Sequence, residues 1–343
     1  MVKIKKEGII LEKTDHPFEN IAVLNPAVIK EGDNVHLVYR AIRRGEYSTI
    51  GYCKLNGPVT VAERLNYPLI NSELDTEKQG LEDPRIVRID DIYYLTYTAY
   101  DGFNSRGVLA ISKDLKTFKK LGNITPSISL IDFMSGNKTG RKMSSRYYHN
   151  QLYYYKEPEP GKILLLWDKN VVFFPRRIKG KLVFLHCIRP GIQIVAINKP
   201  QDLTNEFWDR YFHHFQEHIF MDPIYEHESS YIGSGCPPIQ TDYGWVMIYH
   251  GARETSQGII YSACAAALLD LENPARVITR LPYPLFEPEY LWGTKGEVNN
   301  VVFPTGTALF GDTLFIYYGA ADEHIACASL SLSKLVEELL NSW

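Results

Sequence analysis

Short runs of strand-forming residues recur along the chain, and each run follows a proline by about ten residues. In the second run, apolar and polar residues alternate through Arg85–Ile89, Asp90 and Asp91 form a polar turn, and the alternation resumes through Tyr93–Tyr97. Alternation with a period of two on both sides of such a turn predicts a β-hairpin. Four other runs have the same order of residue types: His36–Tyr39, Leu182–His186, Trp245–His250 and Leu314–Tyr318.

The leading prolines of these runs are Pro26, Pro84, Pro175, Pro238 and Pro304, which are 58, 91, 63 and 66 residues apart. Recurrence at such spacings indicates an array of similar units. For β units the radial arrangement is a propeller, whose four-stranded blades surround a central channel. We therefore predict an all-β fold, a five-bladed β-propeller. Because the units extend over nearly the whole chain, residues 1–343 are predicted to form a single domain.

The long second interval contains an insertion at about residues 132–162, which is basic at first (Lys138, Arg141, Lys142, Arg146) and then rich in tyrosine. It is either a solvated excursion or a wall of the substrate site, because long loops on rigid scaffolds often carry function. Aromatic residues at helical spacing predict a short peripheral helix within Thr204–His218, and Leu332–Leu340 is predicted to be a closing C-terminal helix.

Composition and charge exclude several classes of protein. Apolar residues make up 45% of the chain and charged residues 22%, which is ordinary for a globular protein. The net charge of −3 gives no long-range attraction to nucleic acid or to an anionic membrane. No run of 18 apolar residues is present, so no membrane-spanning helix is predicted. Residues Met1–Glu7 lack the apolar segment of a secretory signal.

Five cysteines are widely separated, and none belongs to a CxxC pair, so no zinc site is predicted. Cys53, Cys264 and Cys327 lie in strand-like apolar runs, and we interpret them as buried free thiols. Free thiols favour a reducing compartment, so we expect a cytoplasmic protein, with the periplasm as the alternative. Three histidines of the predicted peripheral helix lie among aromatic residues, which favours packing over metal binding.

In a propeller, the residues beside the leading prolines would surround one mouth of the channel. Many of these positions are polar or charged, as are the ends of the following hairpins, so we predict a polar pocket at that mouth. The unit starts contribute Asn25, Glu82, Asp83, Arg85, Arg176, Glu226, Glu228, Asn299 and Asn300, and the hairpin ends contribute Arg40, Arg189, His250 and Asp322. For each of these residues the alternative role is a salt bridge between blades.

Seven segments in this order resemble glycoside hydrolase family 130, the β-mannoside phosphorylases and mannosidases, which are five-bladed propellers. The segments are Leu24–Val28, Leu81–Ile86, Phe174–Gly180, Ile232–Ile239, Gly244–Gly251, Ala267–Leu271 and Gly296–Pro304. The resemblance covers nearly the full length. It implies an enzyme that cleaves β-mannosidic linkages of manno-oligosaccharides with inversion and requires no cofactor. It leaves open whether the protein is a monomer or a homo-oligomer.

The resemblance also implies residue roles. Asp83 matches the catalytic acid, which is thought to protonate the leaving oxygen through a hydroxyl of the bound mannose. Burial and the adjacent Glu82 would raise the pKa of this carboxyl, whereas Arg85 would lower it.

Further positions match residues that hold the sugar or shape the pocket: Asn25, Arg40, Glu82, Tyr231 and Asp322. Tyr100, Tyr147 and Tyr231 are candidates for stacking on sugar rings, with packing in the β-sheets as the alternative for each.

The nucleophile decides the reaction. Arg176, Arg189 and His250 match positions that hold inorganic phosphate, and the planar fork of arginine suits that anion. A fourth phosphate-binding position, a lysine in the family, is Tyr231 here. The carboxylates of Glu226 and Glu228 precede Tyr231, and one of them could instead be the base that activates water.

Phosphorolysis, with phosphate as co-substrate, is therefore our first hypothesis, and hydrolysis is the alternative. A non-catalytic sugar-binding propeller is a third hypothesis, because fold alone does not determine function.

Overall fold

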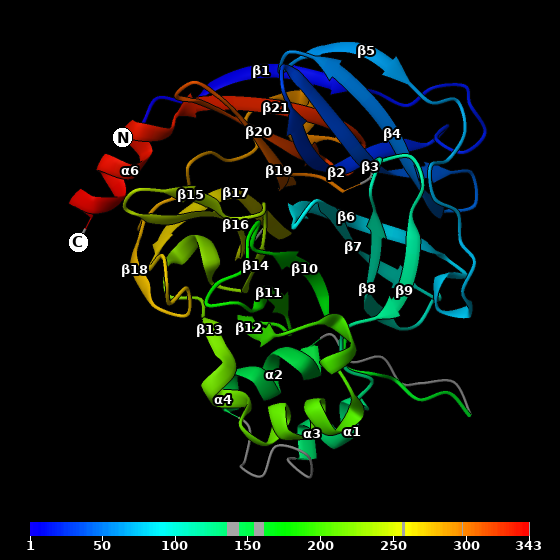
Figure 1. The fold of residues 1–343 in the computed structure, drawn as a ribbon, viewed down its shortest axis with the longest axis vertical. Helices are drawn as coiled ribbons and strands as arrows, with labels where there is room; N and C mark the ends of the chain where they lie inside the picture. Colours follow the sequence, from blue (N-terminus) through cyan, green and yellow to red (C-terminus); the bar gives the residue numbers. More distant parts are fainter. Residues whose placement is uncertain (136–143, 154–160, 256–257, 297, 343) are drawn as a thin grey trace.

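The computed structural model describes residues 1–135, 144–153, 161–255, 258–296 and 298–342. Its strands form five antiparallel units of four strands or more, arranged around a common centre (Figure 1). Unit one contains β2 (Ala22–Glu31), β3 (Asn34–Arg43), β4 (Tyr47–Asn56) and β5 (Thr60–Arg64). Unit two contains β6 (Gly80–Ile89), β7 (Ile92–Tyr100), β8 (Ser105–Ser112) and β9 (Lys119–Asn123). Unit three contains β10 (Lys169–Phe173), β11 (Leu182–Cys187), β12 (Ile192–Ile197) and β13 (Ile219–Met221).

Unit four has a divided inner strand, because β14 and β15 both pair with β16. It contains β14 (Tyr231–Ser234), β15 (Ile239–Thr241), β16 (Gly244–Thr255), β17 (Gly258–Leu269) and β18 (Val277–Arg280). Unit five combines both ends of the chain, since β1 pairs with β21. It contains β1 (Lys5–Leu11), β19 (Val302–Phe310), β20 (Thr313–Ala320) and β21 (His324–Ser331). The prediction of a mostly β chain built from five similar units is confirmed at this level.

The inner strands β19, β2, β6, β10 and β14 contact one another in that order near the centre of Figure 1. Units one and two share one hydrogen-bonded sheet through a single parallel bridge between Ser48 and Gly80. Within the described residues no sheet closes on itself. Side-chain packing therefore holds most of the units together, and buried apolar clusters lie between them.

Three inner strands kink at an equivalent residue with a left-handed backbone. Asn25, Asp83 and Asn170 have φ of 50°, 50° and 54°, and the pairing register shifts beside each of them. Asn and Asp tolerate this conformation better than most residues, and a bulge re-aims a side chain out of the regular sheet. The kink therefore gives three polar side chains the same structural setting at the starts of three neighbouring inner strands.

The prolines that define the repeat do not all occupy this position. Pro26 and Pro84 directly follow the kinked residue, within β2 and β6. Pro175 instead follows the end of β10. The prediction that each leading proline opens an inner strand is therefore wrong for unit three, where Asn170 is the equivalent residue and a valine follows it. It is also wrong for unit four, where Pro238 follows the end of β14.

The predicted helices are present. α3 (Asn205–His213) and α4 (Phe215–His218) occupy the predicted peripheral segment, and the Thr204 hydroxyl caps α3 by accepting from the Phe207 amide. α6 (Leu332–Asn341) buries its apolar face, as the closing helix was expected to do. A short α5 (Leu291–Thr294) precedes unit five.

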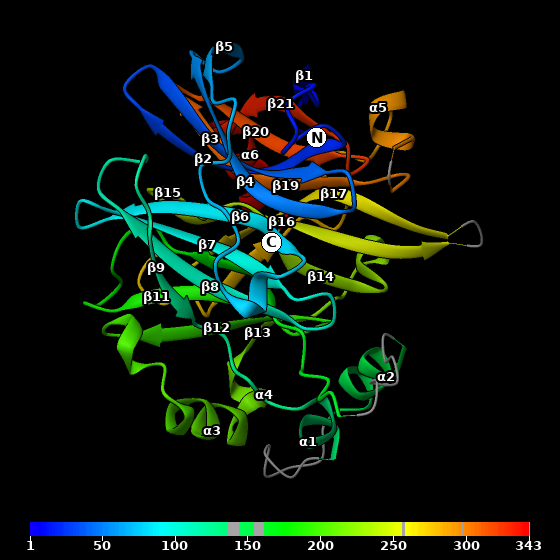
Figure 2. The same ribbon diagram turned by 90° about the vertical axis from the view of Figure 1, so that its right-hand side faces the viewer.

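The insertion forms α1 (Leu130–Ser135) and α2 (Ser145–Tyr153), which lie with α3 and α4 beyond unit three (Figure 2). Its residues 136–143 and 154–160, with Lys138, Arg141 and Lys142, are outside the described residues. All five cysteines are free and buried, as predicted for three of them. No helix in the described part of the chain is long and apolar enough to cross a membrane.

Candidate active site

Asp83 lies in a cluster of charged side chains from the starts of the inner strands and the ends of neighbouring ones. Asn25 Nδ2 donates to Asp83 Oδ1 at 2.7 Å. Arg40 Nη2 donates to Glu82 Oε1 at 2.8 Å, and Arg40 Nη1 lies 3.7 Å from Asp83 Oδ1. The kinks at Asn25 and Asp83 thus bring the side chains of two adjacent units together.

Lys169 extends this cluster toward unit three. Its Nζ donates to Glu82 Oε2 at 3.3 Å, so Glu82 bridges two cations. Burial alone would raise the pKa of Glu82, but Arg40 and Lys169 together hold it below its usual value. Glu82 is therefore an ionised partner for these two cations.

Asp322 completes the acidic side of the site from the turn between β20 and β21. Burial, followed by the Asp83 carboxylate, raises the pKa of Asp322 to about 6, although Arg40 acts in the opposite direction. A carboxyl with such a pKa can donate or accept a hydrogen bond near neutral pH. This suits a group that contacts sugar hydroxyls.

The cations Lys169 and Arg189 line one cavity together with Asn170 and Tyr231. The Arg189 guanidinium lies 3.7 Å from the centre of the Tyr231 ring, and Gln151 of α2 donates to the Arg189 carbonyl at 2.9 Å. The insertion thus contributes Gln151 to this wall, whereas its role toward a substrate stays a prediction. Two cations and an amide at one cavity suit the binding of an anion.

His250 lies behind this wall and is held neutral. Burial, together with the charges of Arg85 and Arg189, lowers the pKa of His250 well below its usual value. Gly233 makes room for the ring, because a Cβ at that position would lie 2.4 Å from His250 Cε1 and 3.0 Å from Asn170 Nδ2. A neutral imidazole can donate a hydrogen bond to an anion but adds no charge to the site.

Several buried polar atoms around the cavity and the acid cluster have no hydrogen-bond partner among the described residues. They are Asn25 Oδ1, Arg40 Nε, Asn170 Oδ1 and His250 Nδ1. Buried polar groups are nearly always paired in folded proteins. A concentration of unpaired ones at one place therefore indicates that a polar ligand or water completes the site.

The structure does not bring Arg176 to this site. Arg176 Nε donates to Gln240, and Nη2 donates to Glu272 at 2.9 Å. Its guanidinium also lies over the Trp245 ring. Trp245 and His250 are five residues apart on β16, which is about 16 Å at the usual rise of a strand. Arg176 follows the end of β10, whereas Lys169 is the first residue of this strand. Lys169 therefore lies where the spacing of the leading prolines predicted Arg176.

The carboxylate of Glu228 belongs to a separate hydrogen-bond network, so Glu228 does not fit the role of a base. It is fully buried, and Oε2 accepts from the amides of Ile224 and Tyr225. Its Oε1 accepts from the Tyr249 hydroxyl at 2.6 Å and from Arg280 Nη2 at 2.5 Å. With both oxygens occupied, this carboxylate has no geometry for activating water. Glu226 is exposed and is not among the residues that line the cavity.

The same arrangement recurs in other units, and we call it the buried clasp. It consists of a buried glutamate, a tyrosine on the second strand and a cation: Glu19 with Tyr39 and Arg64, Glu77 with Tyr97 and Lys120, and Glu228 with Tyr249 and Arg280. The glutamate precedes its tyrosine by 20, 20 and 21 residues. Repetition in three units indicates a structural role for Glu228.

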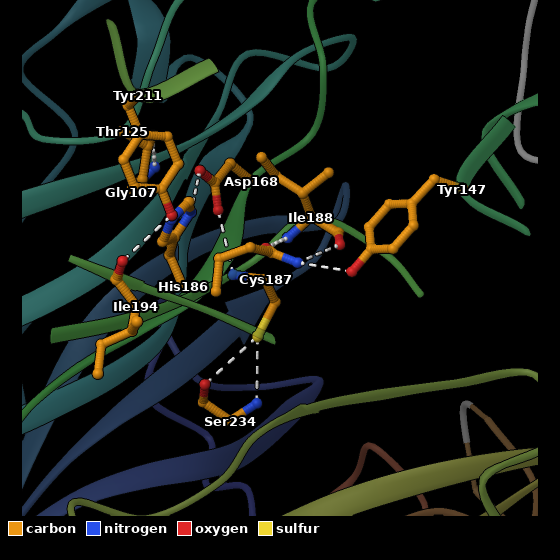
Figure 3. A network of polar contacts seen from close by, with 11 residues as sticks. Gly107, Thr125, Tyr147, Asp168, His186, Cys187, Ile188, Ile194, Tyr211 and Ser234 are labelled. Atoms are coloured by element: carbon orange, nitrogen blue, oxygen red, sulfur yellow. Dashed lines mark hydrogen bonds and ion pairs between the residues drawn. The ribbon is translucent and has the colours of Figure 1, made fainter. Parts of the chain in front are cut away.

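Unit three has a different buried network at the comparable place (Figure 3). His186 Nδ1 contacts Asp168 Oδ2 at 2.7 Å, and His186 Nε2 contacts the Tyr211 hydroxyl at 2.8 Å. Tyr147, a candidate for sugar stacking, points into the same region and contacts Asp222 and Gln193. Its side chain is fully buried, so Tyr147 cannot stack on a sugar.

The remaining stacking candidates differ in exposure. Tyr231 is buried beneath Arg189, whereas Tyr100 is partly exposed, lines the cavity and meets the Trp167 ring edge to face. Trp167 and Lys169 were missed by the sequence analysis. The available signal was the pair Lys169-Asn170, which occupies the position of Glu82-Asp83 but lacks the following proline.

Comparisons with known proteins agree along the whole chain. A family model described as beta-1,4-mannooligosaccharide phosphorylase matches residues 3–341. The 1,2-beta-oligomannan phosphorylase of Thermoanaerobacter sp. (strain X514) is 33% identical over 98% of this chain and 99% of its own. The beta-1,2-mannobiose phosphorylase of the same strain is 31% identical over 98% of both chains. The solved beta-1,2-mannobiose phosphorylase of Listeria innocua has the same fold, with a TM-score of 0.71 and 21% identity over 98% of this chain and 99% of that one.

Proposed function

The chain belongs to glycoside hydrolase family 130, and from this premise we propose that it cleaves β-mannosides by phosphorolysis and releases mannose 1-phosphate. The observation that carries the proposal is that Lys169 and Arg189 line one cavity while Lys169 also contacts the cluster around Asp83. An anion site thus adjoins a carboxylic acid. We place this site at one mouth of the central channel, because its residues come from the starts of β2, β6 and β10.

The proposed reaction is a displacement at C1 of the mannosyl unit. A phosphate oxygen forms the new bond to C1 while the bond from C1 to the leaving oxygen breaks, with inversion. Asp83 supplies the proton to the leaving oxygen through a mannose hydroxyl, and the proton lost by phosphate restores the Asp83 carboxyl. Arg189 and Lys169 hold the phosphate by charge-assisted hydrogen bonds, with Asn170 and His250 as neutral partners.

Asn25, Arg40 and Asp322 are the proposed contacts of the mannosyl unit, since they surround the Asp83 carboxyl. The unpaired atoms Asn25 Oδ1 and Arg40 Nε would then find partners in the sugar hydroxyls. Tyr100 and Trp167 lie beside Lys169 and line the cavity, where they offer aromatic surface to the departing sugar.

Phosphorolysis is favoured over hydrolysis because the hydrolytic alternative loses its candidate base. An inverting hydrolase needs a carboxylate that holds water opposite the acid, and Glu228 is tied into the buried clasp. For the linkage we propose β-1,2, since the two curated relatives above 30% identity are named for β-1,2-linked mannosides.

The test is incubation of the purified protein with β-1,2-mannobiose and with β-1,4-mannobiose, each with and without phosphate. We expect mannose 1-phosphate from β-1,2-mannobiose, and only when phosphate is present. Free mannose formed at equal rates without phosphate would contradict phosphorolysis. Faster turnover of the β-1,4-linked substrate would contradict the proposed linkage alone, and sugar binding without any turnover would favour the non-catalytic alternative.

A further inference from the structure

Arg85 is a buried cation two residues after Asp83, and its side chain is 1% exposed. Its guanidinium donates to backbone carbonyls on both sides of the site. Nη1 donates to the carbonyls of Asp83 and Pro84 at 3.0 and 3.1 Å. Nε and Nη2 donate to the carbonyls of Gly235 and Ser234 at 2.5 and 3.3 Å.

These carbonyls belong to units that are not neighbours. Asp83 and Pro84 lie on β6, whereas Ser234 and Gly235 lie at the end of β14, and β10 stands between those two inner strands in the ring. The guanidinium also lies 5.4 Å from the centre of the Phe303 ring on β19. One side chain therefore links three units across the centre of the molecule.

The far end of this link supports the anion site. The Ser234 amide and hydroxyl both contact Cys187 Sγ, at 3.1 and 3.3 Å (Figure 3). Cys187 lines the cavity two residues before Arg189. Gly233, on the same strand, packs against His250 and Asn170, since a Cβ at this position would come within 3.0 Å of both side chains. A shift of the Ser234 backbone would therefore move the residues assigned to phosphate.

The hydrogen bonds of Arg85 are unusual for a buried arginine. Within the described residues, no carboxylate oxygen lies within 4.0 Å of its guanidinium, and its four hydrogen-bond acceptors are all backbone carbonyls. Burying a charge without a counter-ion in direct contact is costly, and burial lowers the pKa of Arg85 although the Asp83 charge acts in the opposite direction. A smaller apolar residue would avoid this cost but would leave the carbonyls of both strands unpaired. The forked guanidinium can donate to the carbonyls of both strands at once, and this property explains an arginine at this position better than its charge does.

We propose that Arg85 is a positioning residue that fixes the separation between the Asp83 carboxyl and the phosphate-binding wall. This inference rests on the proposed function. The contacts of the mannosyl unit come from units one, two and five and do not depend on the Ser234 backbone. Loss of the fork should therefore weaken phosphate binding and slow the chemical step, while mannoside binding changes little.

The experiment compares Arg85→Lys with the wild-type enzyme, and uses Arg280→Lys as a matched buried arginine of the clasp in unit four. The lysine keeps the charge but cannot span two strands. We expect Arg85→Lys to lower kcat by about 10²-fold, the loss that a misplacement of about 1 Å produces. The KM for phosphate should rise about tenfold, and the KM for the mannoside should stay within about twofold. Arg280→Lys should lower the Tm and leave both KM values unchanged.

If Arg85→Lys does not fold, Arg85→Gln also removes the fork but leaves no buried charge, and it should raise the phosphate KM about tenfold while the KM for the mannoside stays within about twofold. An unchanged phosphate KM in whichever of these two variants folds would overturn the inference. So would a fall in kcat with both KM values changed in the same proportion. A wild-type enzyme that turns over equally fast without phosphate would overturn the proposed function and this inference together, so the two failures are distinguishable.

Discussion

The buried clasp of unit four and the cluster around Asp83 contain the same kinds of groups but differ in how completely those groups are paired. In the clasp, both oxygens of Glu228 accept hydrogen bonds from four named donors. In the Asp83 cluster, buried atoms of Asn25 and Arg40 have no partner among the described residues. The presence of carboxylates and arginines alone therefore does not show whether a buried cluster is structural or functional.

The difference in pairing provides a criterion for function. A saturated buried network stabilises one conformation and offers nothing to a ligand. An incompletely paired network costs stability, which is expected only where a ligand completes it. By this criterion we assign Glu228 to the fold, and the criterion supports the proposed role of Asp83 in the chemistry. Substitutions in the buried clasp should therefore lower stability, whereas substitutions in the cluster around Asp83 should lower activity.

The largest effect is expected from Asp83→Asn. The amide cannot supply the proton for the leaving oxygen, so kcat should fall by about 10³- to 10⁴-fold, the upper part of the usual range for general acid catalysis. The Tm should change little, since the Asn25 contact can be kept. The measurement is phosphate-dependent release of mannose 1-phosphate, with thermal unfolding in parallel. Asp91→Asn, in the exposed turn after the same strand, is the control and should keep full activity.

Glu228→Gln should produce the reverse pattern. Removing one charge of a buried ion pair leaves Arg280 uncompensated and should reduce the free energy of unfolding by about 3 kcal/mol. The folded fraction should retain its kcat, because the side chain does not reach the cavity. Glu226→Gln, two residues away and exposed, should change the free energy by less than about 0.5 kcal/mol. Loss of turnover in a stable Glu228→Gln variant would instead restore Glu228 as a base.

Arg189→Gln should weaken phosphate binding and leave mannoside binding unchanged. Losing a charge-assisted hydrogen bond costs about 2 kcal/mol, so the KM for phosphate should rise about 30-fold while the KM for the mannoside stays constant. Arg176→Gln is the informative control, because the resemblance to the family implied the same role for both arginines. A comparable rise in the phosphate KM for Arg176→Gln would show that the placement of Arg176 outside the site is wrong.

The sequence predicted the five units, the two helical segments and most of the residues around Asp83, because alternation and turn residues are local signals. It misplaced Arg176 because a proline was used to align unit three, whereas the shared feature is the left-handed residue, Asn170. A backbone conformation of this kind has no unique sequence signal, since Asn and Asp also occur in ordinary turns.

The role of Glu228 could not be predicted for a different reason. Its partners Tyr249 and Arg280 are 21 and 52 residues away, so its saturation depends on the pairing of β16 with β17 and β18. The recurring interval of about 20 residues between glutamate and tyrosine was nevertheless visible in the chain. It would have identified Glu228 as one member of a repeated structural element.

The smallest effect is expected from the pH dependence that Asp322 contributes to stability. Burial and the nearby Asp83 raise the pKa of Asp322 to about 6, above its value of about 3.9 in the unfolded chain. Between these two values the folded protein binds more protons than the unfolded chain, so stability must fall as the pH rises from about 4 to about 6. Because the side chain is partly exposed, we expect a contribution of only about 1 kcal/mol. The measurement is the difference in the free energy of unfolding between wild type and Asp322→Asn, which cancels the other titrating groups. This difference should change between pH 4 and 6 and be constant above pH 7, whereas parallel curves throughout would show that folding does not raise the pKa of Asp322.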